Sequence, residues 1–129
     1  MTAYLFDTHL LLWSAAGDPR LPRRAAALIA SEAHVRLFSP VSIAEIAIKW
    51  QQRRPDFQFA PARMRAEMLE EGYVELPLTS LHATRIADLS RLHGDPFDRL
   101  LVAQALAEGV PFVTADAVLA GYPGQIMVV

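Results

Sequence analysis

The sequence contains no cysteine among its 129 residues. This absence excludes disulfide bonds, thiolate metal sites and cysteine nucleophiles, and it fits a reducing compartment. Long hydrophobic runs are absent too, because no segment approaches the roughly 20 apolar residues that a helix needs to span a bilayer. The N-terminus also lacks the basic start and apolar run of a signal peptide. We therefore expect a cytoplasmic protein that has no membrane partner.

Lysine is nearly absent, since Lys49 is the only one and the other eleven basic residues are arginines. Arginine suits bidentate contact with phosphate, but a bias in genomic base composition would produce the same excess. The formal net charge is −2, so bulk charge does not indicate a nucleic-acid-binding protein. Apolar residues are plentiful, at 53%, and they suffice for one domain with a buried core.

Short apolar runs alternate with longer helical segments along the chain. The expected strands are 4–6, 35–38, 73–76, 112–114 and 126–128. The expected helices are 10–16, 22–33, 42 to about 54, 61–71, 79 or 80 to about 92, and 96–108. Strands without polar alternation predict burial on both faces, as in a parallel sheet. The pattern therefore predicts one α/β domain over residues 1–129, a three-layer α/β/α sandwich with a central, mainly parallel sheet of four to five strands.

The clearest helix start is the stretch Gly94–Ala105. Asp95 fits the N-cap and Pro96 the first helical position, so we expect Asp95 to cap the helix, with metal ligation as the alternative. Asp98 follows three residues after the cap, at the head of an apolar helix face. An isolated buried carboxylate is very costly, so Asp98 needs a partner.

Four acids lie at strand ends or helix starts, namely Asp7, Glu45, Asp98 and Asp116. Each alone could be a helix cap or first-turn acid, and Glu45 could pair with Lys49 four residues on. Parallel strands joined by right-handed crossovers end at one edge of the sheet, where we expect these acids to meet. Asp98 is the exception in this argument, because a loop rather than a strand precedes its helix. Clustered carboxylates need a cation, and oxygen ligands suit Mg²⁺ or Mn²⁺ in phosphoryl transfer.

Four motifs, in this order, resemble those of the PIN-domain ribonucleases, and in particular the VapC-type toxins of type II toxin–antitoxin systems. They are Tyr4-Leu5-Phe6-Asp7-Thr8-His9, Ser42-Ile43-Ala44-Glu45-Ile46-Ala47-Ile48-Lys49, Asp95-Pro96-Phe97-Asp98-Arg99-Leu100-Leu101-Val102-Ala103-Gln104-Ala105 and Thr114-Ala115-Asp116. The resemblance covers essentially the whole chain, and no acid of the pattern is missing. It implies a Mg²⁺- or Mn²⁺-dependent endoribonuclease that hydrolyses RNA as a toxin, is inhibited by a small antitoxin protein and forms a homodimer.

The resemblance also implies a role for each acid. Asp7 and Asp98 would be the principal metal ligands. Glu45 and Asp116 would be further ligands, either directly or through water. One of these two would help to deprotonate the attacking water.

Neighbouring polar residues are assigned supporting roles. Thr8 and Thr114 would hold the ligands through their hydroxyls, although an ordinary N-cap and an ordinary strand threonine are the alternatives. His9 lies beside the first acid and could contact substrate, against a surface or packing role. Arg99 could steady a phosphate or pair with an acid.

The two tryptophans, Trp13 and Trp50, are predicted to lie in the core with the leucines of the first helix. An exposed part of that surface would instead predict a groove for the amphipathic helix of an antitoxin.

Two other functions stay open. A PIN-like RNA-binding module with a structural cation would keep the acids and lose cleavage. Another Mg²⁺-dependent phosphatase or phosphotransfer domain would also place an aspartate after the first strand. Receiver domains need a lysine at a late strand end, whereas Lys49 lies in a predicted helix, and haloacid-dehalogenase-type phosphatases need an aspartate where this chain has His9. A nucleotide-binding Rossmann domain is excluded, since no glycine-rich turn follows the first strand.

Overall fold

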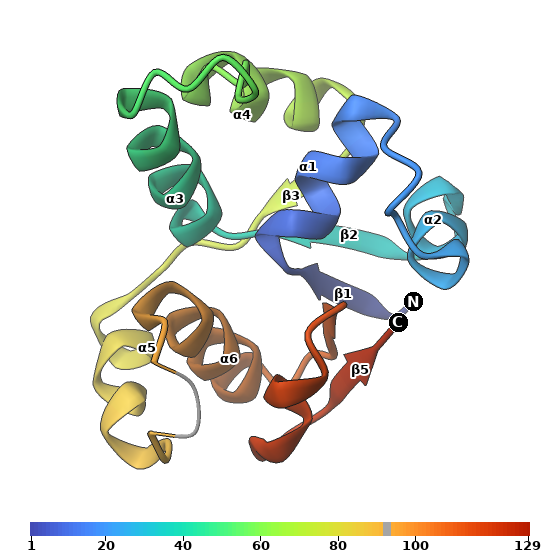
Figure 1. Ribbon diagram of the computed structural model, residues 1–129. Coiled ribbons are helices and arrows are strands. Elements are labelled where there is room, and N and C mark those ends of the chain that lie inside the picture. The colour runs from blue at the N-terminus through green and yellow to red at the C-terminus, as the bar shows by residue number, and fades with distance from the viewer. Residues whose placement is uncertain (92–93) are drawn as a thin grey trace.

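The computed structural model describes residues 1–91 and 94–129, with helices packed around a central sheet (Figure 1). The strands are β1 (Ala3–Phe6), β2 (Val35–Phe38), β3 (Val74–Glu75), β4 (Phe112–Thr114) and β5 (Ile126–Val128). They form a five-stranded sheet in the order β3-β2-β1-β4-β5, and each neighbouring pair is parallel. The first strand of the chain therefore lies in the middle of the sheet, and the predicted parallel α/β architecture is confirmed.

The helices alternate with these strands along the sequence. They are α1 (Thr8–Ala16), α2 (Arg23–Ala30), α3 (Pro40–Gln51), α4 (Pro61–Glu70), α5 (Ser80–Thr84) and α6 (Pro96–Glu108), with short 3₁₀ helices η1 (Arg85–Asp88) and η2 (Ala117–Gly121). Within the described residues, no helix is long and apolar enough to cross a membrane.

The helices cover both faces of the sheet, which makes the three layers that the sequence predicts. Leu5 and Phe112 belong to a core that includes residues of α6 and η2. Phe6 and Val113, the next residues along the same strands, belong to a second core with residues of α1, α2 and α4. Successive strand side chains point to opposite faces, so each face receives fully buried apolar side chains. This double burial is why β1 and β4 show no polar alternation in the sequence.

Local signals at the start of α6 act as the sequence predicts. The Asp95 carboxylate accepts a hydrogen bond from the Phe97 N–H at 2.9 Å, and Pro96 is the first helical residue. The helix ends at Gly109, whose φ of 66° lies in the left-handed region that glycine adopts without strain.

The predicted start of α3 at Ser42 is wrong. Ser39 caps this helix by accepting a hydrogen bond from the Val41 N–H at 3.0 Å, and Pro40 follows at the first helical position. A proline pre-set at this position favours the earlier cap. Ser42 therefore lies inside the helix, which ends at Gln51 rather than near residue 54.

Other predicted boundaries also shift. Thr79 caps α5 as expected, but this helix ends at Thr84 and continues only as η1, while residue 92 lies outside the described residues. The third strand is shorter than predicted, at Val74–Glu75. The second helix ends at Ala30, because Ser31 adopts an extended conformation.

Candidate active site

Asp7 lies between the central strand β1 and the helix α1, and it is 4% exposed. Its Oδ1 accepts a hydrogen bond from the Thr8 N–H at 2.7 Å, which caps the helix. Its Oδ2 accepts a hydrogen bond from the Thr114 hydroxyl, also at 2.7 Å. Both carboxylate oxygens are therefore fixed by the two central strands and the helix that follows the first.

Burial raises the pKa of the Asp7 carboxyl, because the charged form loses contact with water. The Thr114 hydrogen bond, the charge of His9 and the Thr8 N–H oppose this rise, and the charge of Glu45 adds to it. The net direction is upward. A buried aspartate whose pKa rises in this way gains ionisation when a cation binds beside it.

Thr114 connects Asp7 with Asp116 at the end of β4. Its hydroxyl donates to Asp7 and accepts a hydrogen bond from the Asp116 backbone N–H at 3.0 Å. The Asp116 carboxylate in turn caps η2 by accepting from the Val118 N–H at 3.0 Å. Asp116 is half-buried. The threonine thus holds two acids from neighbouring parallel strands at the carboxyl edge of the sheet.

Glu45 lies in the second turn of α3, because this helix begins at Pro40. It is therefore not a first-turn acid that complements the helix dipole, and this structural alternative to a functional role is removed. The side chain is only 9% exposed, and Oε2 lies 3.7 Å from the Lys49 Nζ, so the expected pair forms at a long distance. Oε1 is buried and has no hydrogen-bond partner among residues 1–91 and 94–129.

A pair of buried hydroxyls joins α1 to α3. Thr8 Oγ1 and Ser42 Oγ lie 2.8 Å apart, and both residues are fully buried. The pair couples the residue after Asp7 to the helix that carries Glu45. The sequence does not predict this role of Ser42, because a serine at this position also fits an N-cap. The preceding Ser39-Pro40 pair is the signal that indicates the correct N-cap.

Asp98 occupies the first turn of α6 and is half-buried. This helix leads directly into β4 and therefore runs back across the sheet, so topology places its start at the same edge as the carboxyl ends of the strands. Asp95 caps the helix through the Phe97 N–H. The Nε of Arg99 is buried without a hydrogen-bond partner within the described ranges.

His9 lies on α1, one turn before Trp13. Its side chain is exposed, and the centres of the two rings lie 5.8 Å apart. The imidazole is close enough for its charge to lower the pKa of Asp7.

The donors at this edge suit a hard divalent cation, since they are carboxylate oxygens and the chain has no thiol. The unpartnered Oε1 of Glu45 has lone pairs that an ion would satisfy. Across residues 1–91 and 94–129, however, no three aspartate, glutamate or histidine side chains are grouped closely enough to hold a metal ion. The donor set therefore fits the ion by chemical type.

Comparison with known proteins gives a consistent result. Residues 4–124 match the PIN domain family. Ribonuclease VapC22 of Mycobacterium tuberculosis is 31% identical over 118 residues, which cover 90% of this chain and 88% of that protein. The chain therefore belongs to the PIN domain family. Members of the VapC type are ribonucleases that generally depend on a divalent metal ion.

Solved structures support the fold. A structure of VapBC2 from Rickettsia felis, bound to a DNA fragment from its promoter, contains a chain that matches with a TM-score of 0.70 and 14% identity, covering 98% of this chain and 97% of that one. A toxin–antitoxin complex from Klebsiella pneumoniae matches with a TM-score of 0.65 and 20% identity, covering 96% of each chain. At these identities the likeness establishes the α/β/α fold and leaves the site to be argued from its own residues.

Proposed function

We propose that this chain is a metal-dependent endoribonuclease that hydrolyses RNA phosphodiester bonds as the toxin of a toxin–antitoxin pair. The observation that carries the proposal is the hydrogen-bonded series from Asp7 through Thr114 to Asp116, beside the buried and unpartnered Oε1 of Glu45. The relationship to Ribonuclease VapC22 supports the choice of RNA as substrate.

In this proposal Asp7 and Asp98 are the principal ligands of Mg²⁺ or Mn²⁺, and Glu45 and Asp116 ligate directly or through water. A divalent ion supplies an activated water and neutralises charge on the scissile phosphate. Thr114 keeps the Asp7 carboxylate oriented toward the sheet edge. Glu45 has a free oxygen to accept a proton from water, while Lys49 balances part of its charge at 3.7 Å.

The proposed partners follow from the same relationships. The toxin–antitoxin complexes among the structural matches support a protein antitoxin as partner. We further propose a homodimer, with one PIN domain over residues 1–129 in each copy, and an activity in the cytoplasm, where the RNA substrate is found. Arg99 and His9 flank the acids and are proposed to contact the RNA.

The decisive experiment incubates the purified protein with structured RNA in Mg²⁺, Mn²⁺ or EDTA. We expect cleavage with either metal and none in EDTA. The variants Asp7→Asn and Asp98→Asn keep the side-chain volume and remove the charge, so both should lose cleavage. Cleavage that persists in EDTA or in both variants would contradict the mechanism. RNA binding without cleavage by the unmodified protein would instead favour a binding module with a structural cation.

The toxin role has its own test. Induced expression should arrest bacterial growth, and Glu45→Gln should relieve the arrest because the amide cannot accept the proton or balance the ion. A wild-type chain that leaves growth unchanged, at a level where the protein is detected in the cell, would count against the toxin role.

A further inference from the structure

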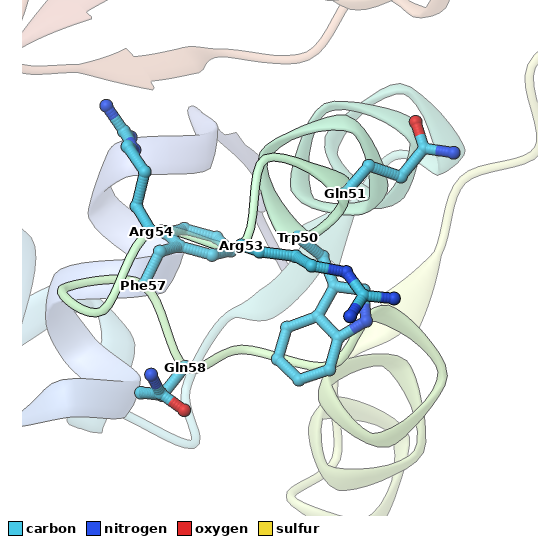
Figure 2. A pocket seen from close by; sticks show the side chains of 6 residues that line it. All are labelled: Trp50, Gln51, Arg53, Arg54, Phe57 and Gln58. Carbon is cyan, nitrogen blue, oxygen red and sulfur yellow. The ribbon is translucent and has the colours of Figure 1, made fainter.

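A pocket lies where α3 ends and the loop to α4 begins. It has a volume of about 740 Å³ and is lined by Trp50, Gln51, Arg53, Arg54, Phe57 and Gln58 (Figure 2). Four of these six side chains are polar, and two of them are arginines. The lining therefore differs from an apolar groove of the kind that takes an amphipathic helix.

Trp50 supplies the largest aromatic surface of this pocket. The sequence predicts a core position for it, and this prediction is wrong, since the residue is 42% exposed. Trp13, in contrast, is half-buried and packs against the core of α1 and α2. The indole of Trp50 is therefore partly open to solvent where it lines the pocket.

Arg53 lies two residues after Gln51, the last residue of α3, in a strained backbone conformation. Its φ is 52°, in the left-handed region where helix ends usually place glycine. A non-glycine residue held there costs free energy, and such outliers concentrate at functional sites. In residues 1–91 and 94–129 its guanidinium has neither an ion pair nor a hydrogen bond to an acid.

Arg54 is only loosely engaged. Its Nε lies 3.9 Å from the Asp56 carboxylate, and both side chains are largely exposed. Figure 2 shows Arg54 leaving the loop on a different side from Arg53 and Trp50. An exposed pair at this distance contributes little, so the cation remains available to a ligand.

We propose that this pocket binds an unpaired nucleotide of the RNA substrate, with the base stacked on Trp50 and the adjacent phosphate contacted by Arg53. Aromatic faces beside arginines are the combination by which proteins hold single-stranded nucleic acid without reading its sequence. The inference rests on the proposed function, because it gives the ribonuclease a second contact with the strand that it cuts.

The helix α3 connects the pocket with the acids. Glu45 and Trp50 both belong to α3 and are five residues apart, which at the rise of an α-helix is about 7.5 Å along its axis. Lys49, the only lysine, lies between them, one turn beyond Glu45 on the same helix face. A single strand bound at Trp50 would pass Lys49, whose side chain is 24% exposed, on its way to Glu45.

The test measures the affinity of the metal-free protein, in EDTA, for a labelled single-stranded RNA of mixed sequence over a range of salt concentrations. Trp50→Ala should weaken binding about tenfold, as loss of one stacked base does, and Trp50→Phe should keep most of the affinity. Arg53→Gly should reduce the salt dependence of binding, lowering the slope of log K against log salt by about 0.7 for the lost phosphate contact.

Arg53→Gly also separates a binding role from a structural one. Glycine relieves the left-handed strain, so this variant should unfold at a higher temperature than the wild type while it binds RNA more weakly. The matched control is Arg85→Ala, which removes an exposed arginine in η1 and should leave the affinity close to that of the wild type.

Three outcomes decide the matter. If Trp50→Ala and Arg53→Gly bind RNA as tightly as Arg85→Ala while the wild type still cleaves RNA with Mg²⁺, the pocket proposal falls and the ribonuclease stands. If these variants lose binding to an antitoxin protein and keep binding to RNA, the pocket is a protein-docking surface and the proposal is overturned. If the wild type neither binds nor cleaves RNA, the proposed function itself fails.

Discussion

The hydroxyls of Thr8 and Ser42 lie 2.8 Å apart in the core between α1 and α3. One hydroxyl belongs to the residue after Asp7, and the other lies on the helix that carries Glu45. The contact therefore fixes the distance between the two helices that hold these acids. It joins residues 34 positions apart in the sequence, so it is a tertiary contact rather than a local turn.

Ser42→Ala removes one partner of this pair and leaves the Thr8 hydroxyl buried alone. We expect a loss of about 1–3 kcal/mol in the free energy of unfolding, measured by urea denaturation, because an unsatisfied buried hydroxyl keeps its desolvation cost. The double variant Thr8→Val with Ser42→Ala should lose less than the sum of the single variants. Ser80→Ala, at an exposed position, should change stability by less than about 0.5 kcal/mol. Additive losses would show that the hydroxyls do not interact.

Asp7→Asn should stabilise the metal-free protein at neutral pH. Burial raises the pKa of Asp7 in the folded protein. The contribution of this carboxyl to the free energy of unfolding is therefore fully present below the pKa of the unfolded chain, about 3.9. It is lost as the pH rises through the pKa of the folded protein. The amide removes this cost and still caps α1. Unfolding temperatures should therefore be higher for the variant at pH 7 and converge with the wild type in acid.

A matched control for this prediction is Asp18→Asn. Hydrogen bonds from Arg20 hold the pKa of the Asp18 carboxyl below its usual range, so its ionised form favours the fold above the unfolded pKa and this contribution is lost as pH falls. The Asp18 variant should therefore be slightly less stable at neutral pH, opposite in sign to the Asp7 variant. The same sign for both would contradict the role of burial at Asp7.

Metal binding should offset the cost at Asp7. Mg²⁺ at about 100 times its dissociation constant should stabilise the wild type by about 2.7 kcal/mol, because an ion that binds only the folded state shifts the unfolding equilibrium. EDTA should reverse the shift. Asp7→Asn should show little response, as one principal ligand charge is lost. A thermal unfolding series at increasing Mg²⁺ measures both responses, and an equal shift in the variant would place the ion elsewhere.

Outside the proposed site, His82 is the buried polar side chain that joins α5 to α6. It is 2% exposed, its Nδ1 accepts a hydrogen bond from the Thr79 N–H, and its Nε2 lies 2.7 Å from the Glu108 carboxylate. Since Nδ1 accepts, Nε2 carries the hydrogen and donates it.

His82→Ala should cost about 3 kcal/mol in the free energy of unfolding, measured in urea, through the cavity and the lost cap. Glu108→Gln keeps an acceptor and should cost less than about 1 kcal/mol. Equal losses of stability in His82→Ala and Glu108→Gln would show that the charge of the Glu108 carboxylate, rather than the cavity and the cap, accounts for the cost.

Much of the fold can be predicted from the sequence because its signals are local. Short runs without charged residues identify β1, β4 and β5, and their lack of polar alternation indicates a parallel sheet. Asp95 with Pro96 identifies the start of α6, since both residues act on backbone groups one or two positions away. Gly109 identifies its end for the same reason. The order of the strands is a tertiary property, and no residue pattern specifies it.

The sequence is less informative where two residues offer the same local chemistry. Ser39 and Ser42 both fit a cap, and only the position of Pro40 separates them. Trp50 differs from Trp13 through the tertiary packing that covers one ring and leaves the other open. The prediction that the acids meet at one edge of the sheet rests on topology alone. Topology specifies the edge but not the rotamers of the acidic side chains. The rotamers depend on contacts such as the hydrogen bond from Thr114 to Asp7.

The central position of β1 has a consequence for synthesis. The ribosome delivers β1 first, yet the hydrogen bond from Thr114 to Asp7 joins residues 107 positions apart. Until β4 emerges, one edge of β1 is unpaired and Asp7 lacks both Thr114 and Asp116. If the chain cuts RNA as proposed, the nascent polypeptide is harmless to the messenger and ribosomal RNA around it. The order in which the strands are made delays the proposed activity until β4 has been synthesised.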